Sequence, residues 1–175
     1  MRHAKSDWLD HGIEVLKTAG ATGLKLEAMV GAMRVTRGSF YWHFENIDAF
    51  KKELLEHWRI RINQTQIEQL SQLPNSAEQI EELVRRVLAQ SQELEAAIRT
   101  WAGSDPHVAE IVKDFDKMRV DYLYAAFAQL GVNPDEALAR ATLMHWAYVG
   151  RAVAPYHDEK TLLKMAPVLA AALSK

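Results

Sequence analysis

The sequence predicts an all-α protein, and three observations lead to that prediction. Apolar residues recur at helical spacing through most of the 175-residue chain. The five prolines and eight glycines sit mostly between those periodic segments. No run of alternating β-branched residues indicates a strand. Hydrophobic residues make up 49% and charged residues 25% of the chain, which is the composition of a globular protein.

The N-terminal part of the chain predicts three short helices and one long helix. They cover residues 6–19, 26–33, 36–42 and 46–72. Gly20 ends the first helix, because glycine readily adopts the backbone conformation that closes a helix. Thr36 and Asn46 stand where side chains cap the third and fourth helices, and Asp48 favours the start of the fourth through the helix dipole. Leu73-Pro74-Asn75 ends the long helix.

The remaining sequence predicts four further helices. They cover residues 76–101, 106–130, 134–153 and 158–173. Ser76 caps the first of them, and the segment from Gly103 to Pro106 ends it. Asn133 followed by Pro134 is a strong helix start, because proline suits the first helical position. Pro167 lies inside the last predicted helix and should kink it or shift its start.

Composition and charge narrow the class of protein. The absence of cysteine excludes disulfides and cysteine metal sites. No signal-like or membrane-spanning apolar run is present, so we expect a cytoplasmic protein that does not enter a membrane. Residues 1–62 carry 10 Lys or Arg and 8 Asp or Glu, whereas residues 63–175 carry 11 and 15. A basic end joined to an acidic body is typical of a DNA-binding head on a regulatory body.

The residues around the third predicted helix offer the chemistry of DNA recognition. Two short helices joined by a tight turn form a helix-turn-helix unit, whose second helix enters the major groove. Phe40 and Phe44 should point inward and hold this helix in place, and Gly38 lets the backbone approach a surface. Donors and flat rings for phosphates and base edges come from Thr36, Arg37, Ser39, Tyr41, Trp42 and His43. Lys51 and Lys52 are further phosphate candidates.

This region resembles the tetracycline-repressor (TetR) family of bacterial transcription regulators over about residues 6 to 60. The resemblance is carried by Gly20, Leu26, Met29, the string from Val35 to Phe44, and Asn46. It implies an all-α homodimer with an N-terminal DNA-binding head and a C-terminal body. It also implies that Thr36, Arg37, Gly38, Ser39, Tyr41, Trp42 and His43 contact DNA. That body usually holds a small-molecule pocket and a dimerising pair of final helices.

Three positions depart from the family pattern. Arg34 stands in the turn where the family usually has glycine, and we predict that it adopts a left-handed backbone with its side chain near DNA. Lys25 replaces a capping Ser or Thr, and Ile47 replaces a lysine at the start of the fourth helix. The last two changes weaken the expected phosphate contacts, which Lys51 or Arg34 could restore.

We therefore predict a DNA-binding domain at 1–50 and an effector-binding and dimerisation domain at 51–175. Candidates for a small-molecule site are Trp101, Phe115, Met118, Tyr122, His145 and Trp146, although each taken alone also fits ordinary core packing. Alanines of the last two helices, such as Ala141, Ala166 and Ala170, suit a four-helix dimer interface or the core of one chain. No metal or cofactor is expected, because the histidines lack ligand spacing.

The predicted function is that of a regulator, most simply a repressor that binds a double-stranded operator as a homodimer. A small apolar or amphipathic effector would lower its operator affinity. One alternative is a helical interaction module that has this fold without binding DNA, suggested by Arg34, Lys25 and Ile47. The other is a small helical enzyme that uses His107 or His145.

Overall fold

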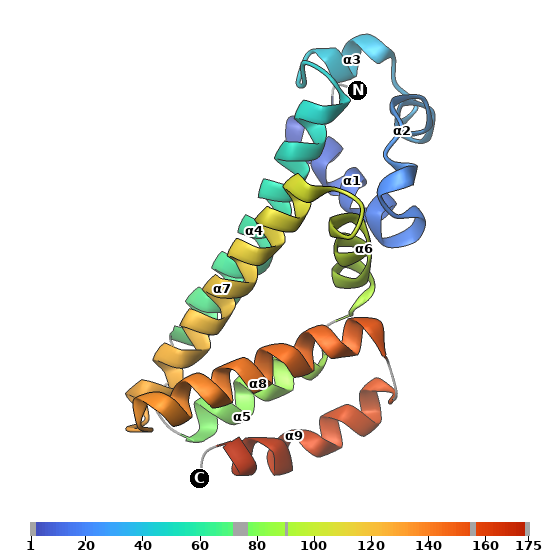
Figure 1. The fold of residues 1–175 in the computed structure, drawn as a ribbon. Helices are drawn as coiled ribbons and strands as arrows, with labels where there is room; N and C mark the ends of the chain where they lie inside the picture. Colours follow the sequence, from blue (N-terminus) through green and yellow to red (C-terminus); the bar gives the residue numbers. More distant parts are fainter. Residues whose placement is uncertain (1–2, 72–76, 90, 155–156, 174–175) are drawn as a thin grey trace. The chain divides into compact units, whose positions relative to one another are not determined.

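The computed structural model describes residues 3–71, 77–89, 91–154 and 157–173. Within these ranges the chain forms helices and no strand, which confirms the all-α prediction (Figure 1). The elements are α1 (Lys5–Ala19), the 3-10 turn η1 (Ala21–Gly23), α2 (Leu26–Met33), α3 (Arg37–Tyr41), α4 (Ile47–Ser71), α5 (Ala77–Ala89), α6 (Glu93–Ala102), α7 (Pro106–Gln129), α8 (Pro134–Val153) and α9 (Glu159–Leu173). Among the described residues, no helix is both long and apolar enough to cross a membrane.

Most of the predicted helix boundaries are confirmed. Gly20 ends α1 with a φ of 64°. Asn46 caps α4, because its Oδ1 accepts a 2.8 Å hydrogen bond from the Ala49 N–H. Asn133 caps α8 in the same way, with the Glu136 N–H donating to its Oδ1 at 3.0 Å. The side-chain chemistry at these positions therefore defines where the long helices start.

The last helix also begins where the sequence indicates. The Asp158 Oδ1 accepts a 2.7 Å hydrogen bond from the Thr161 N–H, and α9 starts at the next residue. Pro167 lies inside α9, which continues on both sides of it, so this proline does not shift the start of the helix. The predicted end and start signals at Leu73 to Ser76 lie outside the described residues.

The single helix predicted for residues 76–101 is wrong, because the chain forms two helices there. α5 ends at Ala89 and α6 begins at Glu93. The residues between them are polar, so no apolar side chain continues the stripe from Leu88 to Leu94. Glu93 and Glu95 lie in the first turn of α6, where the helix dipole favours a negative charge.

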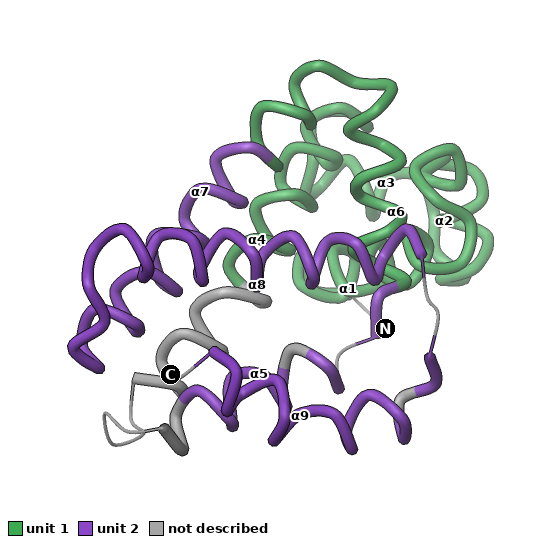
Figure 2. Tube along the Cα trace, turned by 60° about the horizontal axis from the view of Figure 1, so that its bottom comes forward, with its two compact units in different colours: residues 1–63, 93–112 green, residues 64–92, 113–175 purple. Residues whose placement is uncertain are grey.

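Two compact units make up the chain (Figure 2). Unit 1, green in the figure, contains residues 1–63 and 93–112. Unit 2, drawn in purple, contains residues 64–92 and 113–175. The predicted boundary at residue 50 separates a DNA-binding part from an effector-binding part, whereas the two units are defined by packing. The predicted boundary therefore stays a prediction.

Aromatic side chains form the centre of unit 1. The Phe40 ring lies 5.4 Å from Trp8 and 5.7 Å from Phe50, measured between ring centroids. Phe44 lies 5.2 Å from Phe40, and all four side chains are buried. Gly12 of α1 allows α4 to approach closely, since a Cβ at this position would lie 2.7 Å from the Phe50 Cζ. This cluster fixes α3 against α1 and α4.

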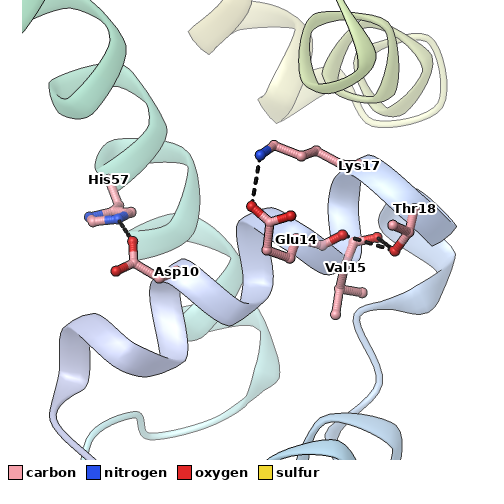
Figure 3. Close-up of polar contacts among 6 residues, drawn as sticks. All are labelled: Asp10, Glu14, Val15, Lys17, Thr18 and His57. Atoms are coloured by element: carbon pink, nitrogen blue, oxygen red, sulfur yellow. Dashed lines mark hydrogen bonds and ion pairs between the residues drawn. The ribbon is translucent and has the colours of Figure 1, made fainter. Parts of the chain in front are cut away.

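Polar contacts reinforce α1 and its junction with α4. The His57 Nε2 lies 2.9 Å from the Asp10 Oδ1, which joins the two helices (Figure 3). Within α1 the Lys17 Nζ donates to the Glu14 Oε1 at 2.7 Å, as Figure 3 also shows. These side chains are exposed or half-buried, so their contacts contribute little to stability. They help to orient α1 against α4, whereas apolar burial holds the two helices together.

The core of unit 2 draws on four helices. Its buried side chains are Ile80, Leu83, Val84 and Leu88 of α5, Leu123 and Phe127 of α7, Ala137, Ala141 and Met144 of α8, and Ala166 and Ala170 of α9. The alanines at 141, 166 and 170 thus pack inside the chain itself. Small residues here let α8 and α9 approach the rest of the core closely.

Candidate nucleic-acid interface

The turn between α2 and α3 has the strained backbone that the sequence predicts. Arg34 adopts a left-handed conformation, with φ 55° and ψ 45°. The Val35 N–H donates to the Val30 carbonyl at 3.1 Å, and the Arg34 N–H donates to the Gly31 carbonyl at 3.2 Å. These bonds satisfy carbonyls at the end of α2 and redirect the chain into α3. Glycine would adopt this conformation without strain, whereas arginine costs about 1 kcal/mol.

Thr36 opens α3 through its backbone and not through its side chain. Its extended conformation marks the start of the helix, and its carbonyl accepts a 3.0 Å hydrogen bond from the Ser39 N–H. The hydroxyl makes no capping bond, so the predicted side-chain cap is wrong. The residue is exposed, so its hydroxyl faces the surface and serves no helix-capping role.

α3 divides its side chains between the core and the solvent. Phe40 and Phe44 are buried, as the sequence predicts. Tyr41 is 56% exposed and Trp42 is 70% exposed. Large apolar rings on the surface lose the free energy of burial. The exposed Tyr41 at the end of α3 and the exposed Trp42 directly after it therefore point to a contact with another molecule.

An open groove runs along this exposed side of α3. Its volume is about 520 Å³, and its lining residues are Arg34, Val35, Thr36, Gly38, Ser39, Trp42 and His43. Six of the predicted DNA contacts therefore gather in one concave surface, and Val35 joins them. A Cβ built on Gly38 would meet only the Thr36 Oγ1, at 3.7 Å, so the space above this glycine is open.

Two further predicted contacts, Arg37 and Lys51, are paired with acidic side chains. The Arg37 Nη2 donates to the Glu27 Oε1 at 2.8 Å. The Lys51 Nζ lies 3.8 Å from the Asp48 Oδ1. Both pairs involve exposed or half-buried side chains, so each contributes little to folding stability and exchanges readily with solvent ions or a ligand.

His43 is tied to the N-terminal segment, which the sequence did not indicate. Its Nε2 lies 3.0 Å from the carbonyl oxygen of His3, so the Nε2–H tautomer donates a hydrogen bond there. The side chain is half-buried and lines the groove. No local pattern could have revealed a contact between residues 40 positions apart.

The predicted small-molecule residues fall into different environments. Trp101 is buried in unit 1, whereas the other five belong to unit 2. Phe115 and His145 are buried, and Met118 and Tyr122 are half-buried. Burial raises the pKa of the Tyr122 hydroxyl, an effect that the charge of Arg86 partly offsets. Trp146 is 67% exposed, which suits a surface contact better than an enclosed pocket.

Sequence reasoning missed three residues that surround His145 and Phe115. The His145 Nε2 lies 3.3 Å from the Asp116 Oδ1. The Arg119 guanidinium stacks 4.2 Å from the Phe115 ring centroid and 4.6 Å from that of Tyr148. The four-residue spacing of Phe115 and Arg119 on one helix was the available signal. Within the described ranges, no group of three His, Asp or Glu side chains could hold a metal ion.

Within the described residues the fold is all-α, and α2 and α3 form a helix-turn-helix whose second helix is exposed, which is the arrangement in which such a helix enters the major groove of DNA. No protein-family model matches the sequence, and no curated protein matches it. A candidate transcriptional regulator described as a TetR/AcrR family member matches with a TM-score of 0.81 and 20% identity, over 98% of each chain.

Two further solved structures show the same arrangement. A transcriptional regulator from Rhodococcus sp. Rha1 matches with a TM-score of 0.74 and 16% identity, over 98% of this chain and 96% of its own. AibR, in complex with isovaleryl coenzyme A and operator DNA, matches with a TM-score of 0.68 and 16% identity, over 94% and 96%. Coverage is high and identity is low, so the likeness establishes a TetR-like fold.

Proposed function

We propose that this protein is a TetR-like transcriptional regulator that binds a double-stranded operator through α3. The exposed surface of α3 carries this proposal, because Tyr41 and Trp42 stand in solvent beside a groove lined by Arg34, Thr36 and Ser39. Rings, hydroxyls and a guanidinium are the groups that contact phosphates, base edges and thymine methyls. Residues 1–50 form the DNA-binding part, which would act in the cytoplasm.

The protein would act as a homodimer through the outer faces of α8 and α9. Among the described residues, nine large hydrophobic side chains are exposed, and six of them lie on these two helices. They are Leu138, Leu143, Trp146, Val153, Val168 and Leu169. At 100° per residue, Leu143, Trp146 and Val153 lie on the side of α8 away from the buried Ala137, Ala141 and Met144, and Leu138 lies at the edge between the two sides. Two-fold pairing of this face would bury it and give the assembly two copies of α3. A helix-turn-helix dimer on DNA needs these two helices in successive major grooves, about 34–36 Å apart.

A small effector bound within residues 51–175 would lower operator affinity. AibR, which shares the fold, was captured with both a coenzyme A thioester and operator DNA. In this chain the cluster of Phe115, Arg119, His145 and Tyr148 offers an apolar wall with charged groups beside it. A ligand changes DNA affinity only if it binds one conformation better than the other. The effector would therefore bind more tightly to the conformation with low operator affinity, and its binding would release the repressor from DNA.

Replacing Arg37 or Tyr41 by alanine tests the DNA-binding assignment. We expect Arg37→Ala to weaken operator binding by about 5-fold to 100-fold, the range of one good side-chain contact to a base. Tyr41→Ala should weaken it too, at the lower end of that range. Both side chains are largely exposed, so thermal unfolding should change little. Fluorescence anisotropy with duplexes selected from a random-sequence pool measures the affinity.

Two results would decide against this function. Unchanged operator binding in both variants contradicts the assigned contacts. An affinity for the duplex that does not change with salt concentration points instead to an interaction module that has no specific role in DNA binding. Phosphate contacts make the affinity of a true DNA-binding protein fall steeply as salt rises. The described neighbours are regulators and not enzymes, so the enzyme alternative is not favoured.

Arg34→Gly should have two opposite effects. Removing a left-handed arginine should stabilise the fold by about 1 kcal/mol, because glycine adopts this backbone conformation without strain. Removing its charge should weaken DNA binding and lower the dependence of log affinity on log salt by about one. Thermal melts and salt-dependent anisotropy measure the two effects separately.

Arg34→Lys is the matched control for this experiment. It keeps both the charge and the left-handed residue, so melting and salt dependence should stay close to those of the parent protein. A less stable Arg34→Gly variant would show that the arginine side chain makes a folding contact that outweighs its backbone strain.

A further inference from the structure

Glu27 and Arg37 form an ion pair that joins the two helices of the helix-turn-helix. Glu27 lies in the first turn of α2, and Arg37 is the first residue of α3. The Arg37 Nη2 donates to the Glu27 Oε1 at 2.8 Å. Their side chains are 67% and 66% exposed, so the pair stands in water on the surface of unit 1.

This exposed pair is a weak support for the fold. Ion pairs in water contribute little to stability, because solvent screens the charges and two long side chains lose freedom. The aromatic core around Phe40 already holds α3 in place. The main consequence of the pair therefore concerns the availability of the Arg37 guanidinium to a ligand.

We infer that Glu27 is a specificity-determining residue, which keeps Arg37 from strengthening the binding of arbitrary DNA. This inference rests on the proposed DNA-binding function. On a random duplex, Arg37 would leave the Glu27 carboxylate and pair with a phosphate instead. Because one ion pair replaces another, this exchange adds little binding free energy. At the operator, a guanine edge offers two acceptors in the geometry of the guanidinium, which repays the loss of Glu27.

The same carboxylate acts against misplaced DNA in a second way. A negative charge beside the groove repels phosphates that approach in the wrong register, which is a repulsive element of the kind that specific interfaces use. Specificity is a ratio of two affinities, and Glu27 lowers the affinity for random DNA more than that for the operator.

Glu27→Gln tests this role, with Glu56→Gln as a matched control. Glu56 also pairs with an arginine, Arg59, at 2.6 Å between exposed side chains of unit 1, but that pair lies within α4. Both variants remove one negative charge, so any effect of net charge alone appears in both. The probes are a random-sequence duplex pool and the duplexes enriched from that pool by the parent protein.

We expect Glu27→Gln to bind the random pool about fivefold more tightly at low salt, the size of one exposed ion pair. Its salt dependence on that pool should steepen by up to about one in log–log slope. Affinity for the enriched duplexes should change by less than about twofold, on the same scale. Glu56→Gln should leave all three measurements near those of the parent protein.

The double variant Glu27→Gln/Arg37→Gln separates this role from a purely structural one. With Arg37 absent, the change at residue 27 should tighten binding to the random pool clearly less than it does in the parent protein, because only the direct repulsion of phosphates by the Glu27 carboxylate is then lost. Equal effects of Glu27→Gln and Glu56→Gln, or unchanged random-pool binding by Glu27→Gln, would overturn the inference and leave the proposed function standing. A parent protein that enriches no duplex would overturn both.

Discussion

Phe40→Ala is expected to destabilise unit 1 by about 3–5 kcal/mol, the loss typical of a buried phenylalanine. The Phe40 ring is buried and contacts Trp8, Phe44 and Phe50 through aromatic packing. α3 has only five helical residues, which is too short for a helix to persist without tertiary packing. Operator binding should therefore disappear together with the ordered head. Thermal and urea unfolding followed by circular dichroism measure the effect.

Trp42→Ala is the matched control, because it removes a larger ring two positions further along the chain. Trp42 is mostly exposed, so its loss should change stability by no more than about 0.5 kcal/mol. DNA binding should still weaken, because Trp42 lines the groove. If the two variants unfold alike, the division between the anchoring and the exposed side of α3 is wrong.

Trp146→Glu is expected to convert the proposed dimer into monomers. A two-fold interface repeats each substitution on both copies, so this change places two carboxylates in an apolar contact. A monomer contacts one half-site only, and losing the linkage should lower operator affinity by about 100-fold. Analytical ultracentrifugation gives the oligomeric state, and fluorescence anisotropy gives the affinity.

Ala125→Glu controls for the added charge, because this exposed residue lies on α7 of the same unit. It should remain a dimer and bind the operator nearly as the parent protein does. A Trp146→Glu protein that stays dimeric with full affinity would show that the exposed face of α8 is not where two copies meet.

The helical architecture could be predicted where side chains set local geometry. Gly20, Asn46 and Asn133 end or start helices as expected, because a helix end is satisfied by neighbours in sequence. The break between α5 and α6 was missed, although polar Ser91 and Gln92 at the positions three and four residues after Leu88 were its signal. A helix is predicted from the number of apolar residues that fall on one face, so a short polar interruption of that face does not divide the predicted helix.

The candidate site was predictable as a set of residues but less so as a set of contacts. The left-handed Arg34 followed from the resemblance, and the burial of Phe40 followed from the pattern of the string. The pairing of His43 with the His3 carbonyl and of Arg37 with Glu27 depends on tertiary geometry, which one sequence does not encode in any local pattern. Contact of these residues with DNA stays a prediction.

The separation of α3 into an anchoring side and a solvent side bears on how such proteins diversify. Phe40 and Phe44 supply the buried apolar surface, so substitutions at Ser39, Tyr41 or Trp42 change the free energy of unfolding little. Duplicated copies of the gene could then acquire new target sequences through single exposed changes while the scaffold persists. Divergence of binding preference in such descendants would leave the aromatic anchors in place.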